Sequence, residues 1–378
     1  MTTSVYGPKQ TPSELTTIFD HVFNKNFAIE EKRGKRGTPL CIWGTHGIGK
    51  TQLVSEYAKL RGWKFAYAAP GQFEEMGDLH GMPTIKASDL NNSANTKGTT
   101  IFSPPEWVPM EDGPGILLLD DINRADDRIL RGIMQLLQNY ELFSWKLPKK
   151  WQIVATANPD SGDYSVTTMD DSMLTRMIHF NMVFQAKSWA VWANASGVDQ
   201  RGIAFVLSYP ECITGKRTTP RTIVQLLDLI SDISDWKNEY DLISSLAGSV
   251  LDQTTMAAFL AFINDELEAL PSPEEILEAE RNTDIKKHIS RLAKGREGDT
   301  KRVDRLSALL TRIFIFISSE GYEPQKKHLE NLVELLIQDV FPNDLRMAFL
   351  TDATKGSFKL KNELLNDHRI AELLLNNL

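Results

Sequence analysis

Residues 38–51 read TPLCIWGTHGIGKT, and no other stretch of the sequence says as much about the fold class. Its first half, up to Gly44, is a short apolar run that predicts a buried strand. Its second half matches G-x-x-x-x-G-K-[ST], in which glycines let the backbone turn its N–H groups around phosphate oxygens. A helical pattern follows over residues 51–61. Strand, turn and helix in that order predict a phosphate-binding loop. The alternative is a glycine-rich turn that binds nothing.

Each part of the predicted loop has a chemical reason. Lys50 is expected to reach the β- and γ-phosphates of a nucleoside triphosphate, and the Thr51 hydroxyl to ligate Mg²⁺. The helix that begins near Lys50 adds the positive end of its dipole. No chemistry of its own is assigned to the side chain of His46. The predicted ATP-binding residues are Gly44, Thr45, His46, Gly47, Ile48, Gly49, Lys50 and Thr51.

Two adjacent carboxylates end a second apolar run, GILLLDD at residues 115–121. The carboxyl ends of parallel strands are where ligands bind in open α/β sheets. We expect Asp120 to hold Mg²⁺, directly or through water, and Asp121 to polarise the attacking water. The alternative is a strand that simply ends at the solvent.

Three further residues are candidates for the chemistry. Asn158 ends a third apolar run, WQIVATANP at 151–159, and its amide can bond both the attacking water and a γ-phosphate oxygen. Asn before Pro is also ordinary turn chemistry. Arg176 and Arg221 can each stabilise the γ-phosphate, in trans from a neighbouring subunit, or can be plain surface residues. The predicted catalytic residues are therefore Asp121, Asn158, Arg176 and Arg221.

Short apolar runs alternate with helical patterns through the first half of the chain. This alternation predicts an α/β fold with a parallel sheet that helices cover on both faces. Beyond about residue 185 the pattern turns helical. The expected strands lie at 38–44, 63–70, 115–121, 151–159 and 177–184, and the expected parts are 1–36 (a helix and a basic loop), 37–184 (the nucleotide-binding domain), 185–235 (a helical lid) and 236–378 (a helical extension).

Composition narrows the class of protein. The 378 residues are 42% hydrophobic and carry a net charge of −8, which does not favour a nucleic-acid or membrane binder. The two cysteines, Cys41 and Cys212, lie far apart and suggest no disulfide framework. The first ten residues lack a signal-peptide pattern, and no apolar run approaches the length of a membrane span. We therefore expect a cytoplasmic protein without a membrane partner.

The order of these elements resembles AAA+ ATPases, and more narrowly the MoxR family with its CbbQ/NorQ and RavA-like members. The resemblance covers residues 37–230 and rests on GTHGIGKT, EEMGDLHGMP, GPGILLLDDINRA, LLQNYEL, VATANP and MLTRM. It implies an AAA+ P-loop core, a helical lid and hydrolysis of ATP with Mg²⁺. The implied roles are Walker A for Lys50 and Thr51, Walker B for Asp120 and Asp121, sensor 1 for Asn158, arginine finger for Arg176, sensor 2 for Arg221 and a subunit contact for Arg124.

The resemblance also implies how such a protein works. It suggests a hexameric ring that remodels a protein partner, together with a von Willebrand factor A domain protein on a separate chain. Two hairpins that engage clients are expected within 80–110 and 141–152. The family usually has Glu where this chain has Asp121, so an ATP-gated scaffold with little turnover stays open. A nucleic-acid-directed motor also stays open, because the hairpins carry Lys86, Lys97, Lys146, Lys149 and Lys150.

Overall fold

The computed structural model describes residues 6–86, 99–159, 166–214, 217–265, 271–293, 302–319, 321–355 and 358–375. The chain divides into two compact units, Met1–Phe184 and Gln185–Leu378. The division falls where the sequence pattern changes from mixed to helical.

A six-stranded sheet forms the centre of the first unit, and all of its neighbouring strands run parallel. The strand order is β1-β10-β2-β9-β6-β3. All five expected strands are present, and the two-residue β1 at the edge is an addition, so the expected α/β class is confirmed. The bounds are β1 (Lys9–Gln10), β2 (Leu40–Trp43), β3 (Lys64–Ala68), β6 (Gly115–Leu119), β9 (Trp151–Ala157) and β10 (Ile178–Met182).

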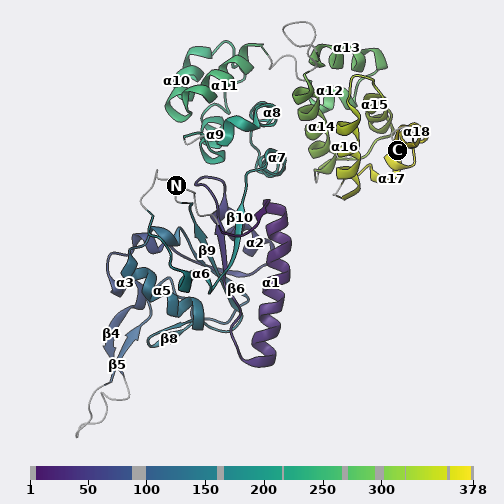
Figure 1. The fold of residues 1–378 in the computed structure, drawn as a ribbon. Helices are drawn as coiled ribbons and strands as arrows, with labels where there is room; N and C mark the ends of the chain where they lie inside the picture. Colours follow the sequence, from purple (N-terminus) through teal and green to yellow (C-terminus); the bar gives the residue numbers. More distant parts are fainter. Residues whose placement is uncertain are drawn as a thin grey trace. The chain divides into compact units, whose positions relative to one another are not determined.

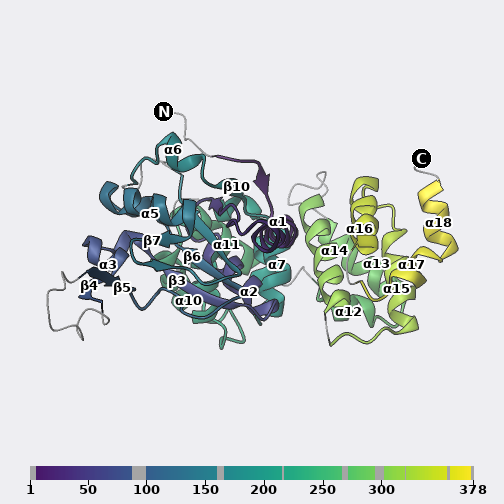
Figure 2. The same cartoon turned by 90° about the horizontal axis from the view of Figure 1, so that it is seen from below.

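Helices cover both faces of this sheet, as Figures 1 and 2 show from two directions. On one face α1 (Pro12–Arg33) and α2 (Lys50–Leu60) pack against alternate residues of the strands. On the other face α3 (Met76–His80), α5 (Asp127–Asn139) and the short α6 (Asp171–Leu174) form a second core. Because both faces are buried, the central strands are apolar at successive positions rather than alternating.

The basic stretch at residues 31–37, expected to be a loop, is helical in its first half. Helix α1 begins at a capping box, in which the Thr11 side chain accepts from Glu14 and the Glu14 side chain from Thr11. It continues to Arg33, where Gly34 adopts φ 61° and donates its N–H to the Glu30 carbonyl. The helix therefore ends at a glycine cap and not at the first cluster of charge, which explains why the expectation was wrong.

Two antiparallel hairpins project from the first unit. Strand β4 (Met82–Ile85) pairs with β5 (Thr100–Ser103), and β7 (Glu141–Leu142) pairs with β8 (Trp145–Lys146). The hairpins contact each other, because the Phe102 N–H donates to the Ser144 hydroxyl at 3.0 Å. The rings of His80, Phe102 and Phe143 also cluster, with centroids 4.5–5.3 Å apart. Residues 87–98, which include Lys97, lie outside the described residues.

The regular elements among the described residues of the second unit are all helical, as expected. The long helix α14 lies at its centre and contacts α7, α8, α12, α13 and α16. None of the described helices of the chain has the length and apolar character needed to cross a membrane. The helices are α7 (Ala186–Ala195), α8 (Gln200–Ser208), α9 (Pro220–Leu229), α10 (Tyr240–Val250), α11 (Gln253–Asp265), α12 (Pro273–Leu277), α13 (Asn282–Ala293), α14 (Val303–Ser318), α15 (Lys326–Leu336), α16 (Asn343–Lys355), α17 (Lys361–Leu365) and α18 (His368–Leu375).

Candidate nucleotide-binding site

The loop between β2 and α2 is held at the carboxyl edge of the sheet. Gly44 follows the last residue of β2 and donates its N–H to the Ala157 carbonyl at 3.2 Å. A Cβ added at Gly44 would lie 2.6 Å from the Ile48 side chain and 2.8 Å from the Met182 carbonyl oxygen. Gly49, the N-cap residue just before α2, has φ 95°, a conformation that favours glycine. The loop is thus closely folded by glycines at two of the predicted positions.

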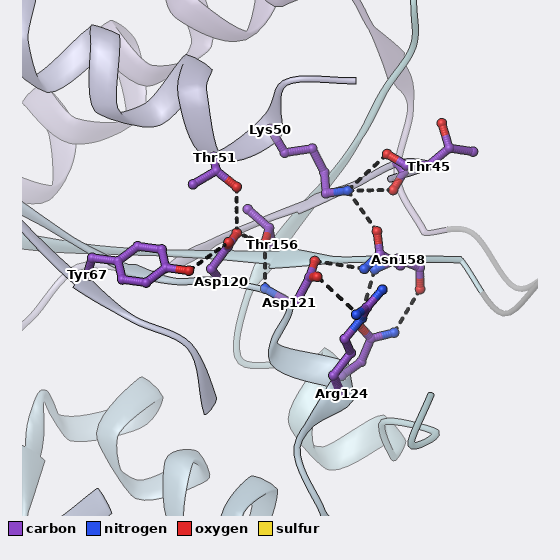
Figure 3. A network of polar contacts seen from close by, with 11 residues as sticks. Thr45, Lys50, Thr51, Tyr67, Asp120, Asp121, Arg124, Thr156 and Asn158 are labelled. Atoms are coloured by element: carbon purple, nitrogen blue, oxygen red, sulfur yellow. Dashed lines mark hydrogen bonds and ion pairs between the residues drawn. The ribbon is translucent and has the colours of Figure 1, made fainter. Parts of the chain in front are cut away.

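Lys50 points back into this loop. Its side chain is buried, with 6% of the residue exposed. The Nζ atom donates to the carbonyl oxygens of Gly44 at 2.7 Å and Thr45 at 3.1 Å, and to Oδ1 of Asn158 at 2.9 Å (Figure 3). A buried ammonium requires such partners. Its charge is therefore held against two carbonyl oxygens of the loop and the Asn158 amide oxygen.

Asp120 follows β6 and accepts hydrogen bonds from neighbouring elements. Its Oδ1 accepts from the hydroxyls of Thr51 at 2.8 Å and Thr156 at 2.6 Å. Its Oδ2 accepts from the Tyr67 hydroxyl at 3.2 Å (Figure 3). The contact between Thr51 and Asp120 joins the two predicted metal-binding residues. It is compatible with metal binding, because a hydroxyl can donate its proton to a carboxylate and keep its lone pairs for a cation.

Asp121 turns away from Asp120 through a left-handed backbone conformation, with φ 48°. Its N–H donates to the Thr156 hydroxyl at 2.8 Å. Its Oδ1 accepts from the Asn158 amide at 2.7 Å, and its Oδ2 lies 3.3 Å from Nε of Arg124. The backbone turn therefore points the two adjacent carboxylates at different partners.

Asn158 connects the lysine to the second carboxylate. It is almost fully buried, accepts from Lys50 and donates to Asp121 through the two ends of one amide. Asn123 fixes its backbone, since the Asn123 amide donates to the Asn158 carbonyl at 2.7 Å and the Asn158 N–H returns a bond at 3.1 Å. The Asn158 side chain thus connects Lys50 directly to Asp121, so a change in the contacts of Lys50 can alter the hydrogen bond that Asp121 accepts.

The two candidate arginines belong to other segments of the chain. Arg176 follows α6, and the backbone N–H of Ile178, two residues on, donates to the Pro39 carbonyl just before β2. The turn of Arg176 is therefore at the amino edge of the sheet, opposite the phosphate loop. Its guanidinium contacts Gln138 and the Ser172 carbonyl. Arg221 lies near the start of α9 in the second unit with an exposed side chain, and its role stays a prediction.

The structure adds residues to the site that the sequence analysis did not select. Thr156 and Asn123 are buried polar residues that organise both carboxylates and the asparagine. A threonine within the otherwise apolar run at 153–157 was a signal for the first. Tyr67 lies on β3, and nothing in its sequence context marks it. Partial burial, together with the negative charge of Asp120, raises the pKa of the Tyr67 hydroxyl, so it stays protonated and able to donate.

The residues at this edge fit a nucleoside triphosphate with Mg²⁺. Lys50 and the loop from Gly44 would hold phosphate oxygens, because a cation and a tightly folded glycine-rich turn meet there. Thr51 and Asp120 offer the hard oxygen donors that Mg²⁺ prefers. The described residues contain no cluster of three or more His, Cys, Asp or Glu that could hold a metal ion by themselves.

Comparison with known proteins gives a family for this region. Residues 39–177 match the AAA domain of the dynein-related subfamily. No curated protein sequence matches the chain. Among solved structures it is similar to Thermotoga maritima RuvB, a Holliday junction branch migration motor, at 14% identity and a TM-score of 0.34, covering 84% of this chain and 94% of that one. A point mutant of that RuvB gives 14% identity, a TM-score of 0.36 and coverage of 85% and 96%.

The sequence match and the observed sheet agree. The match begins at the residue before β2 and ends at the residue before β10, so it spans the phosphate loop, both carboxylates and Asn158. Over residues 39–177 the chain is therefore similar to the AAA domain of the dynein-related subfamily.

Proposed function

We propose that this chain is a Mg²⁺-dependent ATPase that assembles into a hexameric ring and uses ATP hydrolysis to remodel a protein partner. The observation that carries the proposal is the Asn158 side chain, which bonds Lys50 at one end and Asp121 at the other. It links the group that would contact the phosphates to the group that would activate water. AAA domains generally hydrolyse nucleotides, which supports the reaction class.

The residues divide the chemical work among them. Lys50 orients the phosphates, while Thr51 and Asp120 place the metal, which when bound neutralises charge on the phosphate oxygens. Asp121 accepts a hydrogen bond from the attacking water and draws its proton. Asn158 orients that water by exchanging its bond to Lys50 or Asp121 for one to the water or a γ-phosphate oxygen. Aspartate at 121 is one methylene shorter than glutamate, and its left-handed backbone sets where the carboxylate reaches.

A neighbouring copy supplies the remaining cation in this proposal. Arg176 lies at the opposite sheet edge from Lys50, so it is not placed to act on the site of its own sheet. A partly exposed guanidinium at that edge can instead complete the site of the next subunit, which is the reason to propose a ring. An arginine supplied in trans is typically worth about 10³–10⁵ in rate in related phosphoryl transfers.

The hairpins favour a protein as the partner. The exposed residues Met82, Ile85 and Phe143 present apolar side chains, with 69%, 56% and 59% exposure. The ammonium of Lys146 pairs with Glu141 at 2.5 Å, which reduces the charge available to phosphates. A von Willebrand factor A domain protein on a separate chain fits the MoxR resemblance. The opposing candidate is a nucleic-acid motor that uses the hairpin lysines.

Phosphate release by the purified protein tests the reaction. We expect Mg²⁺-dependent release that is lost in Lys50→Ala and in Asp121→Asn, with ATP binding kept in Asp121→Asn. Equal near-zero rates in all three proteins would favour the scaffold. Stimulation by DNA that falls steeply with salt would favour the nucleic-acid motor, because phosphate contacts release counterions. A rate of phosphate release that does not change when DNA is added would favour a protein as the partner.

A further inference from the structure

The histidine beside the first core strand makes contacts that the proposed chemistry does not use. His179 lies on β10, where its Cα pairs with that of Cys41 on β2. Its Nδ1 lies 2.9 Å from Nε1 of Trp43, and its Nε2 lies 2.7 Å from the Leu174 carbonyl oxygen. The ring thus reaches two separate segments at once. One is the last residue of β2, and the other is the last residue of α6.

The contacts fix which nitrogen of the ring carries the proton. An indole N–H can only donate, so Nδ1 of His179 must accept from Trp43. The neutral ring then has its proton on Nε2, which donates to Leu174. Trp43 is nearly buried, and the Tyr6 ring packs against both Trp43 and His179 with centroids 5.2 and 5.8 Å away. The imidazole is therefore held in one orientation from several sides.

The segment that His179 contacts through the Leu174 carbonyl is the turn that contains Arg176. The Leu174 carbonyl also accepts from the Met177 N–H at 3.2 Å, which closes the turn around Arg176. The Arg176 N–H donates to the Met173 carbonyl at 3.1 Å. The remaining side-chain contacts of Arg176 are with Gln138 and the Ser172 carbonyl. The bond from His179 therefore ties this partly exposed turn to the core of the sheet.

We propose that His179 is a positioning residue for Arg176, which it holds by fastening the turn at Leu174 to Trp43, the residue just before the phosphate loop. This inference rests on the proposed function, in which Arg176 completes the site of a neighbouring copy. His179 touches neither nucleotide nor metal in this view and acts through the arginine. Misplacement of a catalytic group by about 1 Å can cost about 100-fold in rate, so a fixed turn has kinetic value.

Two substitutions separate the hydrogen bonds from the packing. His179→Phe keeps an aromatic ring against Tyr6 and Trp43 but removes both hydrogen bonds. His179→Gln can accept through its carbonyl oxygen and donate through its amide nitrogen, so it can restore both. His21→Gln, at an exposed position of α1, controls for loss of a histidine elsewhere.

Phosphate release and ATP affinity are then measured for each variant. We expect His179→Phe to lower the maximal rate about 10- to 100-fold with ATP affinity within about twofold, and His179→Gln to recover most of the rate. The double variant of His179→Phe and Arg176→Ala should be no slower than Arg176→Ala alone, because both changes remove the same contribution. The indole N–H resonance of Trp43 should move in His179→Phe and return toward its position in His179→Gln.

Mixed oligomers add a test that a folding defect cannot mimic. His179→Phe has an intact ATP site, and Asp121→Asn has an intact arginine turn. Mixing them should give a rate above the sum of the two. A wild-type rate in His179→Phe, or additive losses in the double variant, would overturn the inference while leaving the proposed function in place. Absence of hydrolysis by the wild-type protein would overturn the proposed function itself.

Discussion

The two edges of the central sheet hold their charged residues in different ways. At the carboxyl edge, the side chains of Lys50 and Asp120 are hydrogen-bonded to groups from several segments of the chain. At the amino edge, Arg176 is partly exposed, and it contacts a glutamine side chain and a backbone carbonyl four residues earlier in the chain. The first edge is organised for a ligand of its own chain. The second presents a cation outward, which suits an acceptor on another molecule.

The largest expected effect is at the carboxyl edge. Lys50→Ala removes the buried cation of the loop, so heat of binding with Mg·ATP in calorimetry should disappear. The exposed Lys59 on the same helix provides the matched control, and Lys59→Ala should bind as the wild type does. Equal binding by both variants would mean that this edge is not a phosphate site, and the contrast between the edges would lose its meaning.

The next largest effect distinguishes the two edges, because a change at the amino edge should alter the rate of phosphate release but not the affinity for ATP. Arg176→Ala should lower phosphate release by about 10³-fold or more at saturating ATP, because a γ-phosphate cation is removed, while ATP affinity stays close to that of the wild type. Arg131→Ala, at an exposed position of α5, is the control. A parallel loss of affinity in Arg176→Ala would show that the arginine acts within its own site and not in trans.

A smaller effect concerns the stability of the carboxyl edge. Thr156→Val is close in shape but removes the hydroxyl that bonds Asp120 and the Asp121 N–H. We expect a loss of about 1–3 kcal/mol in the free energy of unfolding, measured with denaturant, because buried polar groups lose a partner. Thr84→Val on the exposed hairpin should change it by less than about 0.5 kcal/mol. Equal effects would mean that the network adds no rigidity there.

The smallest effect is a pH dependence at the amino edge. The Asp170 side chain caps α6, and its hydrogen bonds to the Ser172 hydroxyl and the Met173 N–H lower the pKa of this carboxyl. A lowered pKa in the folded state gives stability that is present above the unfolded value and is lost as the pH falls through the folded value. The melting temperature should therefore fall less steeply in acid for Asp170→Asn, which keeps a capping group but does not titrate.

An identical acid slope for Asp170→Asn and the wild type would show that the cap contributes nothing measurable to this edge. Asp170→Ala, which removes the capping group, should lower phosphate release by less than Arg176→Ala does. A loss as large as that of Arg176→Ala would instead place the control of the turn in α6.

Much of the first unit could be predicted from the sequence because its signals are local. The apolar runs marked the strands, and the residues that follow them had to meet at one edge of a parallel sheet. Lys50, Asp120 and Asn158 were therefore found together. The contacts of Thr156 and Tyr67 join residues from different strands, which neither period nor spacing reveals. The extent of α1 depended on a glycine cap beyond its charged end, and such ends are poorly marked by hydrophobic pattern.

The contact between the two hairpins has a practical consequence for anyone who alters this protein. The Phe102 N–H donates to the Ser144 hydroxyl, and His80 packs with Phe102 and Phe143. Residues 80–86 and 99–103 therefore share one set of anchoring contacts with residues 141–146. Deleting either hairpin would remove the hydrogen bond and ring contacts that the other hairpin makes with it. The two hairpins should therefore be altered together when loops are grafted or tags inserted. The effect of changing one hairpin cannot be assigned to that hairpin alone.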